Sequence, residues 1–175
     1  LTGSANQLMS NSGYTFNGSG ITIAKTAGAV TLAGNTTWVI KHNLTMTGGT
    51  LNLNGKNLTV NNVLIIGTGT TLRLHGNETI SYVRMLSQRN SSIWYDSPTG
   101  GTVTMSNYPY QNVIIGSTGS TTFNLPTGQL NLSGSLTISG GTLAVNSNQN
   151  LNVSGSWLKT SATNAGQDFK INQKI

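Results

Sequence analysis

The sequence predicts an all-β protein, a right-handed parallel β-helix (β-solenoid) with about three short strands in each coil of roughly 21 residues. Three observations lead to this prediction. Apolar residues alternate with polar ones in short triplets, the triplets recur every seven residues or so, and glycines separate them. Alternation with period two places one face inward and Thr or Asn outward, as in a strand, and the intervening glycines exclude a continuous helical face.

The apolar triplets define the repeat. From residue 44 onward, their first members lie 7, 7, 6 and 8 residues apart. Strands this short are unusual in antiparallel sandwiches, where about five or six residues are common, but solenoid coils use them routinely. We expect inward side chains to stack on similar residues in the next coil, about 4.8 Å away. The triplets are Ile21–Ile23, Trp38–Ile40, Leu44–Met46, Leu51–Leu53, Leu58–Val60, Leu64–Ile66 and Leu72–Leu74.

An internal duplication supports the same fold. Residues 44–54 (LTMTGGTLNLN) align without a gap to residues 136–146 (LTISGGTLAVN), an offset of 92. Self-similarity along the chain is the signature of repeat architectures. We therefore assign one solenoid to residues 21–160, with related arrays at about 14–62 and 108–155.

Three segments depart from the repeat. Residues 1–20 are predicted to be an N-terminal extension or cap. Residues near 81–97 lack the glycine-separated triplets and are predicted to be an irregular insertion that leaves the solenoid. The tail at 161–175 alternates enough to form one more strand, which is expected to pair with a neighbouring subunit. The residues expected to make that contact are Phe169, Ile171 and Ile175.

Composition restricts the classes of partner. Only 7% of the 175 residues are charged, against about 25% in an average soluble domain. The net charge of +6 comes from nine scattered Lys and Arg residues, and the absence of a basic run argues against nucleic acid. The sequence contains no run of 18 consecutive apolar residues, so it predicts no transmembrane helix. The absence of cysteine excludes disulfides and thiolate metal sites.

The sequence offers little material for catalysis. Enzymes built on β-helices need clustered carboxylates, whereas Glu78, Asp96 and Asp168 are dispersed. His42 and His75 lie at outward or turn positions without acidic companions, which makes a poor metal site. We therefore expect no enzyme activity, no cofactor and no metal, and a polysaccharide lyase or hydrolase is the least favoured hypothesis.

Aromatic residues near the predicted insertion form a candidate binding patch. Aromatic faces with polar neighbours bind sugar rings by stacking and hydrogen bonding, so a carbohydrate-binding surface module is the alternative function. The same aromatics could instead cover the flank of the solenoid or cap one end. The candidate patch comprises Arg84, Arg89, Trp94, Tyr95, Tyr108 and Tyr110.

Eight Asn-x-Ser/Thr sequons are candidate N-glycosylation sites if the chain is secreted. In a sequence rich in Asn and Thr, most such tripeptides are expected to arise by chance. They begin at Asn17, Asn35, Asn43, Asn57, Asn77, Asn90, Asn131 and Asn152.

The repeats resemble those of a known group of proteins. Residues 43–60 (NLTMTGGTLNLNGKNLTV), 110–115 (YQNVII), 130–138 (LNLSGSLTI) and 153–157 (VSGSW) are similar to repeats of secreted bacterial and archaeal β-solenoid surface proteins, including adhesin and autotransporter stalks. The resemblance covers about residues 20–160 and implies a parallel β-helix on or outside the cell. It rests on the repeat pattern and carries over no functional residue.

The two ends of a solenoid suggest how such a protein is used. Each end presents a row of unpaired backbone groups, which a protein either caps or uses for association. We therefore predict a non-enzymatic structural component of the extracellular surface. It would be either the subunit of a fibre, assembled by end-to-end or strand-addition contacts, or a segment of an adhesin stalk. The chain begins at Leu1 without Met, which predicts either a removed leader or an excised fragment.

Overall fold

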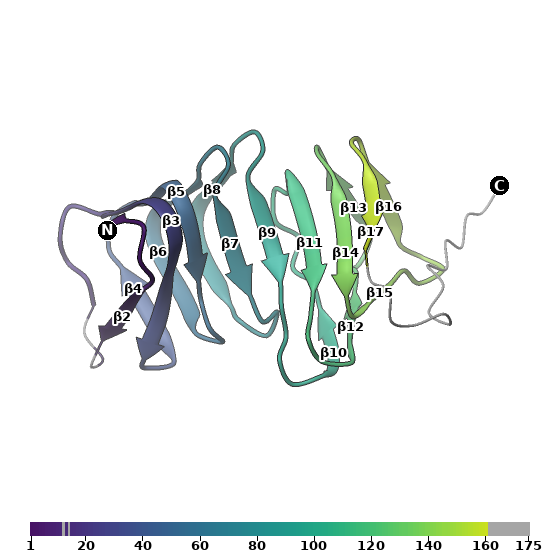
Figure 1. Cartoon of the computed structure of the whole chain (residues 1–175), viewed down its shortest axis with the longest axis horizontal. Helices are drawn as coiled ribbons and strands as arrows, with labels where there is room; N and C mark the ends of the chain where they lie inside the picture. Colours follow the sequence, from purple (N-terminus) through teal and green to yellow (C-terminus); the bar gives the residue numbers. More distant parts are fainter. Residues whose placement is uncertain (12, 14, 161–175) are drawn as a thin grey trace.

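The computed structural model describes residues 1–11, 13 and 15–160. This part of the chain contains strands and no helix. Parallel strands stack in coils about 21 residues apart and form a β-solenoid of about seven turns (Figure 1). The predicted fold class and coil length are therefore confirmed.

Each coil crosses three faces, which we call A, B and C in chain order. Long strands bend around a corner and contribute to two faces, so that β3 (Ile21–Gly34) and β5 (Leu44–Asn52) begin on face A and end on face B. Face B is continuous along the whole solenoid. Besides the ends of β3 and β5 it contains β2 (Gln7–Asn11), β7 (Thr71–Leu74), β9 (Ser92–Tyr95), β11 (Asn112–Gly116), β14 (Leu136–Gly140) and β17 (Trp157–Lys159).

The other two faces share the remaining strands. Two long strands, β6 (Asn57–Ile66) and β8 (Ile80–Ser87), begin on face C and end on face A. Face A also contains β1 (Thr2–Gly3), β13 (Gln129–Leu132) and β16 (Asn150–Val153). Face C also contains β4 (Thr37–Ile40), β10 (Gly101–Thr104), β12 (Thr121–Asn124) and β15 (Thr142–Ala144).

Inward side chains form ladders along the axis, as the alternation predicts. On face B one aliphatic residue from each of six successive coils lies directly opposite its counterpart in the next coil. All six are at most 2% exposed, so burial of apolar area holds each coil on its neighbour. The ladder consists of Val30, Leu51, Leu72, Ile93, Val113 and Leu136.

The two copies of the internal duplication lie on different faces. Leu44 is on face A, opposite Leu64, whereas the matching Leu136 is on face B, opposite Val113. An offset of 92 residues corresponds to about four and one-third coils of 21 residues, so the second copy is rotated by one face. The unit that recurs in the sequence is therefore one strand with its turn, and not one coil.

The prediction of an irregular insertion near residues 81–97 is wrong. Strand β8 pairs with β6, and β9 pairs with β7 and β11 in regular register. The repeat is hidden there because outward positions carry apolar side chains such as Trp94, and because an inward position carries Tyr95. Apolar and polar residues consequently do not alternate in the sequence here, although successive side chains of β9 still alternate between outward and inward positions.

The irregular stretch lies half a coil later. It interrupts strand pairing between β8 and β10 on face C and between β8 and β13 on face A, and we call this break the seam. Among the described strands, β8 pairs only with β6, β10 joins a separate sheet with β12 and β15, and β13 pairs with β16. In the described part of the chain, strand pairing crosses this level only on face B, between β9 and β11. The seam therefore divides faces A and C into two stacks.

The N-terminal residues belong to the first coil. Strands β1 and β2 both pair with β3, and the buried Lys25 side chain ties the connection between them to the solenoid. Its Nζ donates to the carbonyl oxygens of Thr2 at 3.0 Å and Ala5 at 2.5 Å. The predicted pairing strand in the tail, with Phe169, Ile171 and Ile175, lies outside the described residues.

Asparagine side chains connect successive coils at the corners. The Oδ1 atoms of Asn43, Asn57 and Asn112 each accept a hydrogen bond from a backbone N–H in the next coil, at 3.2, 2.8 and 2.8 Å. A carboxamide can supply an acceptor where the strand ladder is interrupted. These three asparagines therefore link successive coils without adding charge.

Glycine at the corner after β6 permits close stacking of two coils. A Cβ atom at Gly67 would overlap the carbonyl oxygen of Met46 in the preceding coil. We expect Gly67→Ala to lower the free energy of unfolding by about 1–3 kcal/mol, because backbone would have to move. Thermal unfolding followed by circular dichroism measures the loss. Gly69→Ala is the control. A Cβ atom at Gly69 would have no atom within 4 Å, so only its backbone φ of +70° disfavours a side chain, at a cost of about 1–2 kcal/mol. Equal stability of wild type and Gly67→Ala would contradict the close approach.

Candidate functional site

The six residues of the predicted aromatic patch do not meet at the surface. Tyr95, Tyr108 and Tyr110 are inside the solenoid, with exposed fractions of 1%, 8% and 2%. Trp94 points outward from face B and is half-buried, whereas Arg84 lies exposed in the face-A part of β8. The sixth residue, Arg89, is exposed in the turn between β8 and β9. The structure thus separates the residues that the sequence places together.

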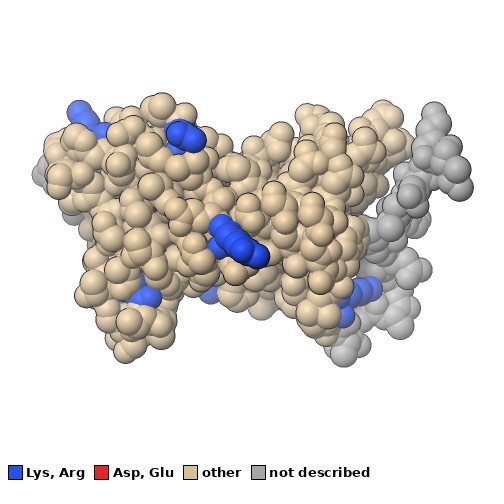
Figure 2. Space-filling view, turned by 90° about the horizontal axis from the view of Figure 1, so that it is seen from above, with Lys and Arg blue, Asp and Glu red and all other residues tan. Residues whose placement is uncertain are grey.

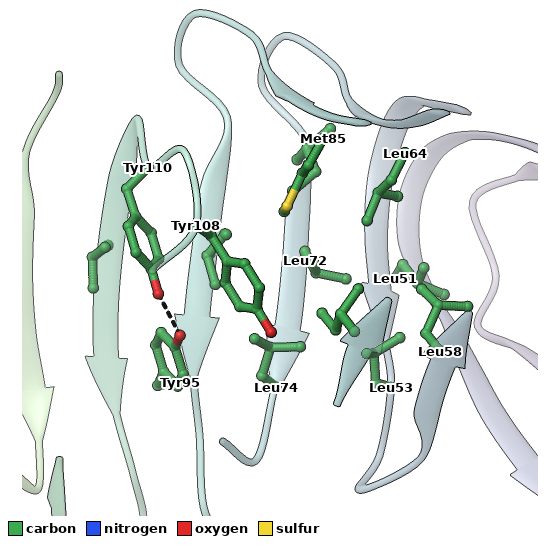
Figure 3. Close-up of a cluster of buried hydrophobic side chains, with 14 of the residues drawn as sticks. Leu51, Leu53, Leu58, Leu64, Leu72, Leu74, Met85, Tyr95, Tyr108 and Tyr110 are labelled. Atoms are coloured by element: carbon green, nitrogen blue, oxygen red, sulfur yellow. Dashed lines mark hydrogen bonds between the residues drawn. The ribbon is translucent and has the colours of Figure 1, made fainter. Parts of the chain in front are cut away.

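The buried tyrosines fill the interior at the level of the seam (Figure 3). The hydroxyl oxygens of Tyr95 and Tyr110 are 2.5 Å apart, and the Tyr110 hydroxyl donates to the carbonyl oxygen of Ser106 at 2.5 Å. Tyr95 also contacts Phe123 edge to face, with ring centroids 5.8 Å apart. Burial raises the pKa of Tyr95, Tyr108 and Tyr110, which favours their neutral, hydrogen-bonding forms.

The order of these hydrogen bonds predicts unequal effects of two similar substitutions. Tyr110→Phe removes the partner of the Tyr95 hydroxyl and the donor to Ser106, so we expect a loss of about 1–3 kcal/mol in the free energy of unfolding. Tyr95→Phe leaves the bond from Tyr110 to Ser106 in place and should cost less. Urea unfolding of both variants tests this order. A larger loss of stability in Tyr95→Phe than in Tyr110→Phe would contradict a hydrogen bond donated by Tyr110 to Ser106.

The outward-facing Trp94 is already covered by a cation. The guanidinium carbon of Arg73 lies 4.7 Å from the Trp94 ring centroid, and the same guanidinium forms an ion pair with the buried carboxylate of Asp96. On the other side, Gly116 leaves space for the indole, since a Cβ there would overlap its Nε1. A sugar therefore could not stack on the Trp94 ring without displacing Arg73.

The two acidic residues of the described chain both stabilise the backbone or a cation. Asp96 is paired with Arg73, and the Glu78 carboxylate, in a residue only 7% exposed, accepts three backbone N–H groups. These come from Gly55 at 3.0 Å, His75 at 2.7 Å and Gly76 at 2.6 Å. Within residues 1–160, apart from 12 and 14, no group of three or more His, Cys, Asp and Glu side chains could hold a metal ion.

The surface itself is weakly charged. Isolated Lys and Arg side chains interrupt a largely uncharged face in Figure 2, and they do not gather into a stripe. Seven of the eight sequon asparagines are exposed and Asn57 is half-buried. The exposed residues are Asn17, Asn35, Asn43, Asn77, Asn90, Asn131 and Asn152.

A shallow hollow opens on face A at the seam. It has a volume of about 510 Å³ and lies between the end of β8 and strand β13. Two of its residues, Tyr108 and Tyr110, belong to the aromatic group that the sequence offers either as a sugar-binding patch or as cover for the solenoid. The lining consists of Ser87, Asn107, Tyr108, Pro109, Tyr110, Gln111, Gln129, Asn131 and Ser133.

No family model, no curated protein and no solved structure matches this chain. The part of the chain that the structure describes also contains no helix of the length and apolarity needed to cross a membrane.

Proposed function

We propose that this chain is a non-enzymatic structural segment of the extracellular surface, either a fibre subunit or part of an adhesin stalk. The observation that carries the proposal is the aliphatic ladder of face B, which runs unbroken through six successive coils from Val30 to Leu136. Each coil is held only by its neighbours, so length can increase without a larger core. This is the property required of a spacer.

The chemistry of the surface supports the same proposal. Glu78 and Asp96 are engaged in structural interactions, which leaves neither carboxylate free for acid or base chemistry. The low charge also provides little repulsion between neighbouring molecules. An enzyme that cleaves polysaccharides would need a pair of free carboxylates in a cleft.

The ends of the described solenoid provide a means of association. Strand β2 at one end and β17 at the other each pair with a single neighbour among the described strands. An open parallel edge can accept a strand from another molecule or segment. The tail residues Phe169, Ile171 and Ile175 are one candidate source of such a strand.

Electron microscopy and size measurements of the full chain test the proposal. We expect rods or filaments, and an increase in mass with protein concentration. Leu158→Pro places a residue without an N–H group in β17 and should reduce association. Replacing Phe169 and Ile171 together by Ala distinguishes strand addition by the tail from direct stacking of coils. A chain that stays monomeric at high concentration, with all variants alike, would exclude the fibre version.

A further inference from the structure

The hollow on face A exists because one coil, between β8 and β13, contributes no strand to this face. Residues 107–111 form its floor, Ser87 at the end of β8 forms one wall, and β13 forms the other. Among the described residues, one isolated bridge, between Tyr110 and Leu132, joins β13 to the preceding coil. The resulting space lies where a regular coil would have placed a strand.

The lining of this hollow is polar but uncharged. Apart from Pro109, every lining side chain carries a hydroxyl or a carboxamide, and the Tyr108 and Tyr110 rings beneath the surface make the floor rigid. Hydroxyls and carboxamides both donate and accept hydrogen bonds. A neutral ligand rich in hydroxyl groups matches this set, whereas an acidic or basic ligand would find no opposite charge in the lining.

The amides of the β13 wall are held in a fixed arrangement. Asn131 Oδ1 accepts hydrogen bonds from Gln129 Nε2 at 2.7 Å and from Asn152 Nδ2 in the next coil at 3.0 Å. This leaves the amide nitrogen of Asn131 as a donor and the carbonyl oxygen of Gln129 as an acceptor for a ligand. Side chains that are already ordered lose less conformational entropy on binding.

The opposite wall contains a polar atom that lacks a partner. Ser87 Oγ is buried and makes no hydrogen bond within the described structure. A buried hydroxyl without a partner is costly, and an ordered water or a bound ligand can supply the missing hydrogen bond. The two walls thus offer hydrogen-bonding groups from both sides of one hollow.

We propose that this hollow binds a neutral saccharide chain through Ser87, Asn107, Gln129 and Asn131. The proposal is independent of the fibre function, since it concerns the flank of the solenoid and not its ends. An extended peptide that pairs with the open edge of β8 is the rival occupant. The saccharide is favoured because residues 107–111 already cover the floor and because every lining residue except Pro109 carries a side-chain hydroxyl or carboxamide.

Affinity electrophoresis with immobilised neutral polysaccharides tests the proposal. The full chain is produced in a host without N-glycosylation, so that Asn131 stays unmodified, and is run through gels containing dextran, mannan, hydroxyethyl cellulose or galactomannan. Polygalacturonate serves as the acidic comparison. We expect retardation by at least one neutral polymer, and about tenfold weaker binding when Gln129 and Asn131 are both replaced by Ala.

A matched variant and the alternative outcomes decide the result. Replacing Asn61 and Asn62, two exposed amides on the turn inside β6, by Ala should leave binding unchanged. Thermal unfolding confirms that each variant is folded. Retardation by polygalacturonate alone, no retardation by any neutral polymer, or equal loss in both double variants would overturn the proposal. Binding of an extended peptide in place of every glycan would assign the hollow to strand addition and would also overturn it.

Discussion

Glu78→Ala is expected to lower the free energy of unfolding by about 3 kcal/mol or more. The carboxylate accepts the backbone N–H groups of Gly55, His75 and Gly76, and these donors belong to two successive coils. Removing it leaves three donors without a partner at one corner. Urea unfolding followed by circular dichroism, with the midpoint and the slope both fitted, gives the loss.

Two further substitutions show whether the acceptor itself matters. Glu78→Gln keeps an oxygen for two of the donors but places an NH₂ group against the third, so its loss should lie between those of wild type and Glu78→Ala. Asn77→Ala, at the exposed neighbouring position, should change stability by less than about 0.5 kcal/mol. A Glu78→Ala chain as stable as Asn77→Ala would show that the corner does not depend on the carboxylate.

Leu64→Ala is expected to lower the free energy of unfolding by about 2–5 kcal/mol, the second large effect on stability. Leu64 is fully buried on face A, between Leu44 of the preceding coil and Met85 of the next one. Truncation creates a cavity that rigid stacked strands cannot close. The same unfolding measurement applies, and heat should unfold the variant at a lower temperature than wild type.

The adjacent residue provides a control with nearly the same chemistry. Ile65 follows Leu64 in β6 but points outward and is only half-buried, so Ile65→Ala should cost about 1 kcal/mol or less. The comparison tests the alternation of inward and outward positions directly. Similar losses for the two variants would mean that this strand does not have one buried and one open face.

The sequence predicts the solenoid where outward residues are polar. Leu44, Leu51 and Leu58 are recognised as inward because Thr or Asn alternates with them, and all three are at most 1% exposed. The same reasoning fails at β9, because Trp94 is apolar yet outward. Its indole lies against Arg73, a residue one coil away, and no local pattern reveals that contact.

The hollow could not be predicted because it depends on how the coils align. Its floor and walls come from three successive coils about 21 residues apart, and they consist of residues 87, 107–111, 129, 131 and 133. Whether they enclose a space depends on the missing strand at the seam. The buried tyrosines were equally hard to place, since the amphipathic side chain of tyrosine suits a surface as well as an interior with a hydrogen-bond partner.

The rotation between the two duplicated copies affects how such a rod can vary in length. Because each strand with its turn can occupy any of the three faces, gaining or losing one unit of about seven residues would preserve the stacked interior. All coils that follow the inserted or deleted unit would be rotated by a third of a revolution about the solenoid axis. Homologous rods that differ by one such unit would therefore display the same flank feature in different directions, while rods that differ by three units would keep it aligned.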